Sequence, residues 1–257
     1  MRAIILAAGR GSRLSPAQTS PQPKCLLKFG GVSLLERHLR LLQAAGVTEV
    51  VMVLGFEHPV IETELRRLAA LGLPQPETLI NERFILGSVL SVHVAAAAMR
   101  RGGDVLLMDA DVLYDTRIMQ ALAGAAAPSN RILIDRDFEA GDEPVKVCVQ
   151  DGIAVELRKQ LAPGLHYDTI GESVGFFRFD ERAARRLADL VADYVESGRA
   201  NLPHEETLRD LILERSQVFQ IVDVTGAPWI EIDFPADVER AAREVLPQLM
   251  SFSGAAA

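Results

Sequence analysis

Apolar residues in the first half of the chain form short runs that alternate with longer segments of helical spacing. Residues 3–6 and 50–54 are compact apolar runs with the length of a buried strand. Between them, leucines recur at helical spacing over residues 33–45, with Ser33 placed to cap a helix and Gly46 to end it. A strand, a loop, a helix and a second strand in this order predict parallel strands joined by a right-handed crossover.

The alternation of strands and helices continues along the chain. At residues 145–157 the pattern of an antiparallel hairpin follows. Residues 145–149 and 153–157 flank Gln150-Asp151-Gly152, which is the turn chemistry of an antiparallel hairpin. The other expected elements are a helix at 88–99, strands at 104–108, 132–135, 173–179 and 218–222, a helix from Asp180 to Gly198, a helix at 204–214, and a last helix with Pro235 in its first turn.

This order of elements predicts an α/β fold of Rossmann-like type. We expect a mixed, mostly parallel central sheet flanked by helices, with a small antiparallel hairpin region added to it. The chain should form a single domain over residues 1–247, with a first half at about 1–135 and a second at about 136–247. Residues 248–257 are expected to be a disordered tail, because they include a run of small and polar residues.

Composition and charge narrow the class of protein. The 257 residues carry a formal net charge of −8 and a sequence pI near 5.2, which argues against a protein that coats nucleic acid or a membrane surface. No apolar run is long enough for a membrane span or a secretory signal, so we expect a cytoplasmic protein without membrane insertion. Cys25 and Cys148 can form at most one bridge, and we interpret both as small core residues.

A glycine-bearing loop, Gly9-Arg10-Gly11-Ser12-Arg13, follows the first strand directly. Glycines at this place let the backbone approach a ligand and offer N–H donors to phosphate oxygens. Arg13 and the later Lys24 add cationic groups suited to phosphate. The loop lacks the spacing of the dinucleotide fingerprint and of the P-loop. Taken alone, it is equally compatible with an ordinary tight turn that carries surface arginines.

Two acidic clusters could hold a cation. Asp109-Ala110-Asp111 ends the strand at 104–108, and ligands of parallel α/β sheets bind at the carboxyl ends of strands. Carboxylates two residues apart suit a hard divalent cation, although a helix cap and a solvated loop residue would give the same pattern. The second cluster is Glu231-Ile232-Asp233, in which Asp233 alone is more typical of a cap for the helix after Pro235.

The combined motifs resemble the nucleotidylyltransferase superfamily that activates sugar phosphates and alcohol phosphates. Residues 6–14, Leu-Ala-Ala-Gly-Arg-Gly-Ser-Arg-Leu, followed by Pro23-Lys24, match its L-A-A-G-x-G-x-R…P-K signature, and Leu86-Gly87-Ser88 is similar to its L-G-[TS] segment. Within it, the chain is most similar to choline-phosphate and aminoalkylphosphonate cytidylyltransferases. That likeness rests on Pro-Lys-Cys-Leu-Leu at 23–27, Asp-Ala-Asp at 109–111, Glu143-x-x-Lys146 before Asp151-Gly152, Gly-Glu-x-x-Gly-Phe at 171–176, and Trp-x-Glu-Ile-Asp at 229–233.

The resemblance implies transfer of a nucleotidyl group, CMP from CTP, to a small phosphorylated or phosphonylated amino alcohol such as phosphocholine or 2-aminoethylphosphonate, with release of pyrophosphate. The first half would bind the nucleoside triphosphate and the second the acceptor, with no nucleic-acid partner; a homodimer is compatible with the family. Two alternatives stay open. One is a hexose-1-phosphate nucleotidylyltransferase that uses UTP or GTP, and the other is a catalytically silent nucleotide-sensing subunit.

The same resemblance implies a role for each matching residue. Lys24 and Arg13 would be catalytic, and Asp111 and Asp233 would hold Mg²⁺. The nucleotide would be bound by Leu6, Ala8, Gly9, Gly11, Ser12, Arg13, Lys24, Asn81, Gly87, Ser88 and Asp109. The acceptor would be bound by Lys146, Glu172, Glu205 and Trp229, with Lys159 as a further candidate for its phosphate.

An ammonium group on the acceptor would favour Trp229, the only tryptophan in the chain. Trp229 precedes Asp233 by four residues, so an extended segment would turn both side chains toward the same cleft, roughly 13 Å apart. Glu172 and Glu205 would supply negative charge. His204 stands beside two glutamates, a setting that would allow metal binding, but we interpret it as the solvated start of a helix.

Overall fold

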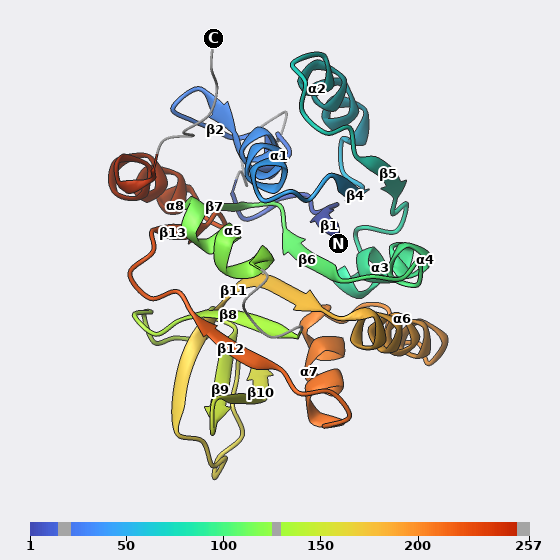
Figure 1. Ribbon diagram of the computed structural model, residues 1–257, viewed down its shortest axis with the longest axis vertical. Coiled ribbons are helices and arrows are strands. Elements are labelled where there is room, and N and C mark those ends of the chain that lie inside the picture. Colours follow the sequence, from blue (N-terminus) through green and yellow to red (C-terminus); the bar gives the residue numbers. More distant parts are fainter. Residues whose placement is uncertain (15–21, 125–129, 251–257) are drawn as a thin grey trace.

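The computed structural model describes residues 1–14, 22–124 and 130–250, and its largest element is a nine-stranded mixed sheet (Figure 1). The strand order is β5-β4-β1-β6-β11-β8-β12-β10-β9. The strands of this sheet are β1 (Arg2–Ala7), β4 (Glu49–Leu54), β5 (Glu77–Ile80), β6 (Val105–Asp109), β8 (Arg131–Asp135), β9 (Lys146–Gln150), β10 (Ile153–Arg158), β11 (Thr169–Phe179) and β12 (Gln220–Asp223). The expected α/β class with a mixed central sheet is confirmed.

Two small sheets, eight α-helices and three short helical segments of other types make up the other described elements. The short segments are η1 (Lys24–Leu26), η2 (Ala241–Val245) and η3 (Leu246–Gln248). The two-stranded sheets pair β2 (Lys28–Phe29) with β3 (Val32–Ser33), and β7 (Val112–Tyr114) with β13 (Trp229–Glu231). The helices are α1 (Leu34–Ala44), α2 (His58–Ala70), α3 (Ser88–Val94), α4 (Ala96–Met99), α5 (Thr116–Ala123), α6 (Glu181–Glu196), α7 (Glu205–Leu213) and α8 (Pro235–Arg240). Within the described ranges, every helix is too short or too polar to span a bilayer.

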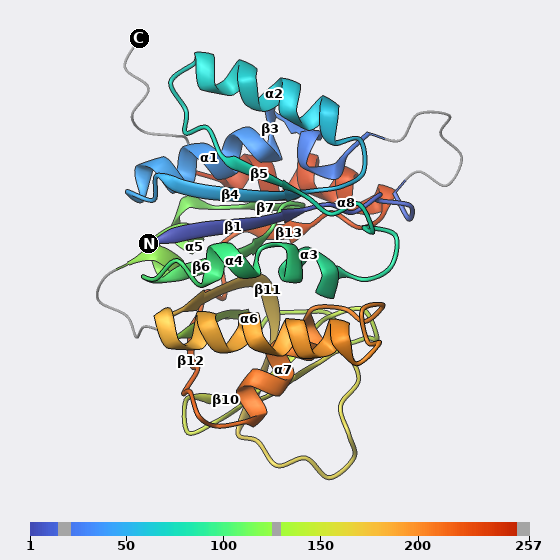
Figure 2. The ribbon, with the colours of Figure 1, turned by 90° about the vertical axis from the view of Figure 1, so that its right-hand side faces the viewer.

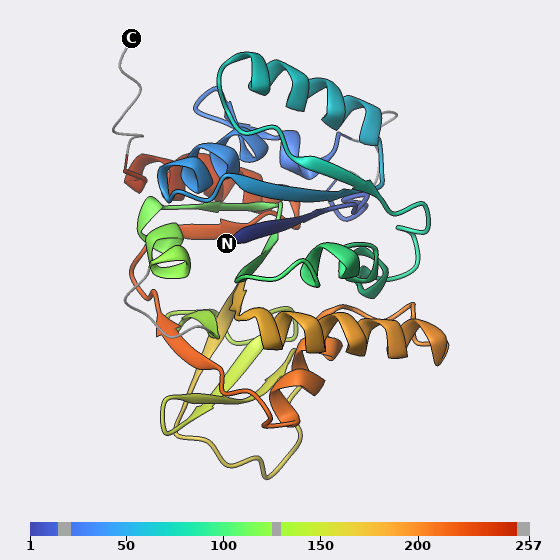
Figure 3. The same ribbon diagram turned by 45° about the vertical axis from the view of Figure 1, so that its right-hand side comes forward.

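Helices cover both faces of the parallel strands β5, β4, β1 and β6. Leucines of α1 and α2 pack with alternate residues of β1 and β4 in one buried cluster, while α3, α4 and α6 pack on the other face (Figure 2). Helix α6 lies between α3 and α4 on one side and α7 on the other (Figure 3). Burial on both faces explains why β1, β4 and β6 are nearly continuous apolar runs in the sequence, whereas the edge strand β5 is not.

The second half is more than an added hairpin. Strand β11 pairs antiparallel with β6, β8 and β9, and β9 continues through β10 and β12 back to β8, so that five strands close on themselves. The register of β11 shifts between Ser173 and Phe177, around Gly175, whose φ is +78°. A Cβ on Gly175 would lie 2.6 Å from Asp109 Oδ2, so glycine is needed where the end of β6 meets this bend.

Most expected elements are confirmed. The Ser33 side chain caps α1 by accepting from Glu36 N at 3.1 Å, Asp180 caps α6, and Pro235 stands in the first turn of α8. The hairpin of β9 and β10 turns at Gln150-Asp151-Gly152. The helix expected at 88–99 is divided at Ala95 into α3 and α4, and α2 and β5 are additional elements. Most of the expected disordered tail, residues 251–257, lies outside the described residues.

Candidate active site

The site lies at the carboxyl ends of β1 and β6, which are neighbouring parallel strands. Leu6 at the end of β1 stands in register with Asp109 at the end of β6. The glycine loop follows β1 and the turn Asp109-Ala110-Asp111 follows β6, so topology alone places the phosphate-binding candidates beside the acidic ones. Strand β13 pairs with β7 directly after this turn, and that pairing adds the Glu231-Ile232-Asp233 segment to the same edge.

Three carboxylates gather at this edge, those of Asp111, Glu231 and Asp233. One oxygen of each lies within 4.8 Å of the other two. The Ile232 amide donates to the Asp111 carbonyl at 2.9 Å, which fixes the two acidic segments against each other. Oxygen donors at this spacing fit a hard divalent cation such as Mg²⁺. Asp233 does not cap α8; Asp237 Oδ2 accepts from the amides of both Asp233 and Phe234 instead.

Lys24 lies between two of these carboxylates. Its Nζ donates to Asp111 Oδ2 at 2.8 Å and to Asp233 Oδ1 at 2.7 Å. Burial by itself would lower the pKa of Lys24, but Asp111 and Asp233 outweigh it and raise the pKa above its ordinary value. The ammonium is therefore charged at all physiological pH values. Lys24 and Arg13 together bring two positive charges to three acidic side chains, so the cluster keeps an excess of acidic groups that fits a divalent cation.

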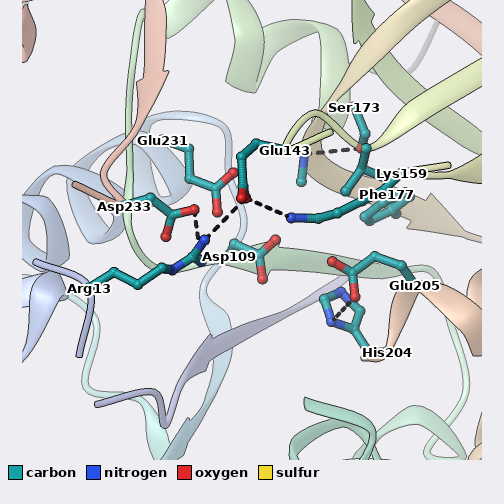
Figure 4. Close-up of a pocket in the computed structure, with 12 residues that line it drawn as sticks. Arg13, Asp109, Glu143, Lys159, Ser173, Phe177, His204, Glu205, Glu231 and Asp233 are labelled. Atoms are coloured by element: carbon teal, nitrogen blue, oxygen red, sulfur yellow. Dashed lines mark hydrogen bonds and ion pairs between the residues drawn. The ribbon is translucent and has the colours of Figure 1, made fainter. Parts of the chain in front are cut away.

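A cavity of about 110 Å³ extends from this cluster toward the second half of the chain (Figure 4). Arg13 reaches across its mouth, with Nη2 3.0 Å from Asp233 Oδ2 and Nη1 3.1 Å from Glu143 Oε2. Lys159 Nζ lies 3.3 Å from the same Glu143 oxygen. Two cations from different halves of the chain thus meet one carboxylate oxygen. The charged residues lining the cavity are Arg13, Asp109, Glu143, Lys159, Glu205, Glu231 and Asp233.

A smaller hollow of about 70 Å³ lies under the glycine loop. It is lined by Leu6, Ala7, Gly9, Gly11, Lys24, Cys25, Ala110 and Asp111. Gly11 has a φ of +61°, and a Cβ there would lie 3.0 Å from Lys24 Cγ, so only glycine lets the loop close over the lysine stem. This hollow joins backbone donors, one ammonium and one carboxylate, which are the groups that bind phosphates together with a metal ion.

The family description "MobA-like NTP transferase domain" matches residues 3–171. That range holds the glycine loop, Lys24 and the Asp109–Asp111 turn. The chain belongs to the MobA-like NTP transferase family. It is a nucleotidyltransferase, as the resemblance of its motifs predicts.

Similarity to named proteins runs along nearly the whole chain. The transferase is 24% identical over 262 residues to the CTP:phosphoglutamine cytidylyltransferase of Campylobacter jejuni, covering 93% of this chain and 98% of the relative. It is 27% identical over 215 residues to the 2-aminoethylphosphonate cytidylyltransferase of Lancefieldella rimae, covering 82% and 80%. The inositol-1-phosphate CTP transferase from T. maritima shares the fold, with a TM-score of 0.76 at 20% identity over 100% of this chain and 97% of that one. The chain spans only about half the length of the bifunctional IPC transferase and DIPP synthases that it also matches.

Several residues predicted to bind the nucleotide make hydrogen bonds or close contacts within the protein. Asn81 is 2% exposed; its Nδ2 donates to Ser91 Oγ at 3.1 Å and its Oδ1 accepts from Arg83 N at 3.0 Å. Ser88 Oγ accepts from His204 N at 2.8 Å, and a Cβ on Gly87 would lie 2.5 Å from the backbone of Asn201. Ala8 O accepts from Phe56 N at 3.1 Å. Ser12 is exposed on the loop. Their contacts with a nucleotide stay predictions.

The acceptor candidates do not form one cluster. Glu205 lines the 110 Å³ cavity with Asp109, whereas Trp229 is not among its lining residues in the described chain. Strand β13 ends at Glu231, so the extended segment expected to run from Trp229 to Asp233 stops short. The indole Nε1 donates to Asp135 Oδ2 at 2.8 Å, and Glu172 stands opposite Asp135 in the sheet. Trp229 and Glu172 therefore both lie beside Asp135, whereas Glu205 lines the cavity.

Lys146 and His204 differ most from expectation. The Lys146 ammonium donates to the carbonyls of Gly141 at 2.6 Å, Lys159 at 2.6 Å and Pro144 at 3.4 Å, so it fastens the loop that carries Glu143. His204 is 5% exposed and lines the cavity, which corrects its interpretation as a solvated helix start. Local spacing does not predict this burial, because the side chain that hydrogen-bonds the His204 ring is Ser88, 116 residues away in the chain. Cys25 and Cys148 are buried and unbridged, as expected.

The protonation of Glu172 can be measured through the pH dependence of the free energy of unfolding. Burial first, and then Asp135, raise the pKa of Glu172 to about 7. The unfolded chain titrates nearer the ordinary value, so between the two values the folded state holds the extra proton, and stability is lost as pH rises through this window. We expect Glu172→Gln to gain about 1–2 kcal/mol relative to the native chain between roughly pH 5 and pH 8.

Urea unfolding of both proteins across this pH range measures the difference. Glu196→Gln, at the exposed end of α6, is the matched control for replacing one glutamate by glutamine. A difference that does not change with pH for Glu172→Gln would contradict the raised pKa.

Proposed function

We propose that this chain transfers a cytidylyl group from CTP to a small phosphorylated or phosphonylated acceptor that carries an amino group, and releases pyrophosphate. The observation that carries the proposal is the cluster of Lys24, Asp111, Glu231 and Asp233 next to the glycine loop. Relatives named for CTP and for phosphoglutamine or aminoethylphosphonate support the nucleotide and the kind of acceptor.

The reaction needs no covalent enzyme intermediate. A phosphate or phosphonate oxygen of the acceptor attacks the α-phosphorus of CTP, the new P–O bond forms in line, and the bond to the bridging oxygen of pyrophosphate breaks. Since the attacking oxygen is already anionic, no base has to remove a proton, and positioning and charge neutralisation supply the catalysis. When bound, Mg²⁺ would supply positive charge at the phosphate oxygens. Asp111, Glu231 and Asp233 would hold it.

We assign the phosphate groups of the two substrates to different cationic side chains of the chain. Lys24 lies at the floor of the 70 Å³ hollow and would neutralise charge on the α-phosphate as pyrophosphate departs. Arg13 and Lys159 meet at one oxygen of Glu143, and two cations converging on one oxygen define an anion site. We assign this site to the phosphate or phosphonate of the acceptor, which would displace the Glu143 carboxylate on binding.

Two carboxyl groups that line the cavity support an amino group on the acceptor. Asp109 and Glu205 both line the cavity, and burial, Asp111 and Glu205 together raise the pKa of Asp109 well above its ordinary value. Glu205 Oε2 is buried without a hydrogen-bond partner in the described chain, although His204 Nδ1 lies 3.2 Å away. Such carboxyl groups gain from a bound ammonium, which supplies donors and opposite charge at once.

Pyrophosphate release tests the proposal directly. The assay combines each of CTP, UTP, GTP and ATP with 2-aminoethylphosphonate, phosphocholine, inositol 1-phosphate and glucose 1-phosphate in the presence of Mg²⁺. Turnover with CTP and the amino acceptors is expected. Turnover only with glucose 1-phosphate and UTP or GTP would support the hexose-phosphate alternative instead. Nucleotide binding without turnover on any acceptor would support a sensing subunit.

Glu205→Gln should raise the KM for acceptors that carry an amino group and not for the others. We expect the KM for 2-aminoethylphosphonate to rise about tenfold, because a charge-assisted hydrogen bond contributes about 1.5–3 kcal/mol and the neutral amide keeps part of it. The KM for CTP should not change. Glu206→Gln is the matched control: Glu206 is the next residue, but it pairs with Arg158 at 3.0 Å outside the cavity. An equal rise in KM for both variants would remove Glu205 from the amine site.

A further inference from the structure

A buried histidine lies directly beneath the turn that carries Asp111. His38 of α1 is fully buried, with Nε2 3.2 Å from Ala110 O and Nδ1 3.2 Å from the Tyr114 hydroxyl. Burial lowers the pKa of His38 to about 4, so the ring is neutral and has one N–H. A carbonyl oxygen can only accept, so Nε2 carries the hydrogen and the Tyr114 hydroxyl donates to Nδ1.

This hydrogen bond completes a set that fixes the backbone on both sides of Asp111. The Ala110 carbonyl belongs to the peptide before Asp111, and His38 holds it. The Asp111 carbonyl belongs to the peptide after it and accepts from Ile232 N at 2.9 Å, while Ala110 N donates to Leu6 O at 3.2 Å. With both flanking peptide planes held, the direction of the Asp111 Cα–Cβ bond has little freedom.

The rings around His38 keep this arrangement rigid. Tyr114 lies 5.2 Å and Phe176 6.2 Å from the histidine ring centroid, and these two rings meet edge to face at 4.8 Å. Tyr114 is in β7, which begins directly after Asp111, so the residue that orients the histidine belongs to the strand that leaves the turn. None of these three rings is among the residues that line the cavity.

We infer that His38 is a positioning residue: through the Ala110 carbonyl it sets the orientation of Asp111 toward the cation shared with Glu231 and Asp233. The inference rests on the metal site of the proposed function. The role of His38 differs from that of the acidic residues, because the neutral histidine ring contributes nothing to the charge of the site. Its loss should weaken the binding of a divalent cation while leaving nucleotide binding in the absence of metal unchanged.

The test measures Mn²⁺ alone on the full chain, by electron paramagnetic resonance titration, in three variants. His38→Leu removes both hydrogen bonds and should raise the Kd for Mn²⁺ by about tenfold, as loss of a partner that orients a metal ligand does. His38→Gln can still donate to Ala110 and accept from Tyr114, and should restore binding to within about threefold. Leu39→Ala, the next residue of α1 and fully buried, is the control for general destabilisation. It should leave the Kd unchanged.

Activity assays add a second reading. The Mg²⁺ concentration for half-maximal turnover should rise in His38→Leu in step with the Mn²⁺ Kd, with the KM for the acceptor unchanged. If His38→Leu does not fold, Tyr114→Phe replaces it and should weaken Mn²⁺ binding by about threefold. An unchanged Kd in the folded variant, or an equal change in Leu39→Ala, overturns the inference. A native chain that binds Mn²⁺ but transfers no nucleotide would overturn the proposed function and leave the role of His38 intact.

Discussion

Replacing Asp111 or Asp233 by asparagine is expected to lower turnover by at least about 10³-fold while the protein stays folded. Each change keeps the shape of the side chain and removes one of the negative charges around the proposed cation. Without that charge, the proposed cation would lose a ligand, and neutralisation of the phosphate oxygens by a cation is worth several kcal/mol at the transition state. Both residues are only partly buried, so the fold does not depend on their charge.

Steady-state rates over a Mg²⁺ titration, with thermal unfolding of each variant, measure this effect. Asp189→Asn serves as the control, because it removes an exposed ion pair with Arg100 far along α6 and should leave the rate unchanged. Near-normal Mg²⁺-dependent turnover in Asp111→Asn or Asp233→Asn would remove that residue from the metal site. A rate restored by higher Mg²⁺ would show a weakened site and not an abolished one.

The strand-helix alternation was enough to place part of this site. A buried strand that runs into glycines, and another that runs into aspartates, must bring both to one edge if the strands are parallel, and Leu6 and Asp109 do stand in register. Asp233 is more than a hundred residues beyond Asp111, and only the family resemblance linked them. Glu231 stands in an acidic cluster of the sequence, but the direction of its side chain depends on a three-residue strand, which is too short to show a period.

The acceptor side was harder to predict because its residues are fixed by distant partners. The direction of Trp229 depends on Asp135 and on where β13 ends, and neither can be read from local spacing. The ammonium of Lys146 is occupied by backbone carbonyls of its own loop, including that of Lys159. The side chains of Trp229 and Lys146 are of the types expected in a ligand site. Their hydrogen-bond partners, which come from tertiary packing, decide what remains for a ligand.

His38 illustrates the same limit in the buried part of the site. In the sequence it is one polar residue within a leucine-rich helix, a position where histidine most often has a structural role. Its significance comes from lying under the Asp109–Asp111 turn, which requires the packing of α1 against β6 and β7. Periodicity predicts that α1 packs on the sheet, but it does not predict which carbonyl the histidine meets.

Lys24→Ala should lower kcat by about 30- to 1,000-fold, which corresponds to roughly 2–4 kcal/mol of lost transition-state stabilisation. In the proposed reaction, charge on the phosphate oxygens increases as pyrophosphate departs, and the Lys24 ammonium lines the hollow to which we assign these phosphates. Its contacts of 2.7–2.8 Å to Asp233 and Asp111 hold it in place before substrate binds, so little reorganisation is needed during the reaction. The KM for CTP should change much less, because backbone donors of the glycine loop remain.

Two further variants distinguish the effect of the Lys24 charge on kcat from the effect of its side-chain packing. Lys24→Met keeps a stem of similar length against Gly11 and should lose nearly as much kcat as Lys24→Ala, since the lost group is the ammonium. Lys28→Ala removes an exposed lysine four residues later and should leave both constants unchanged. Single-turnover rates with saturating CTP distinguish chemistry from product release. Unchanged kcat with a raised KM for CTP would make Lys24 a residue that only binds the triphosphate, because an interaction equally strong in the ground state and the transition state does not accelerate the chemical step.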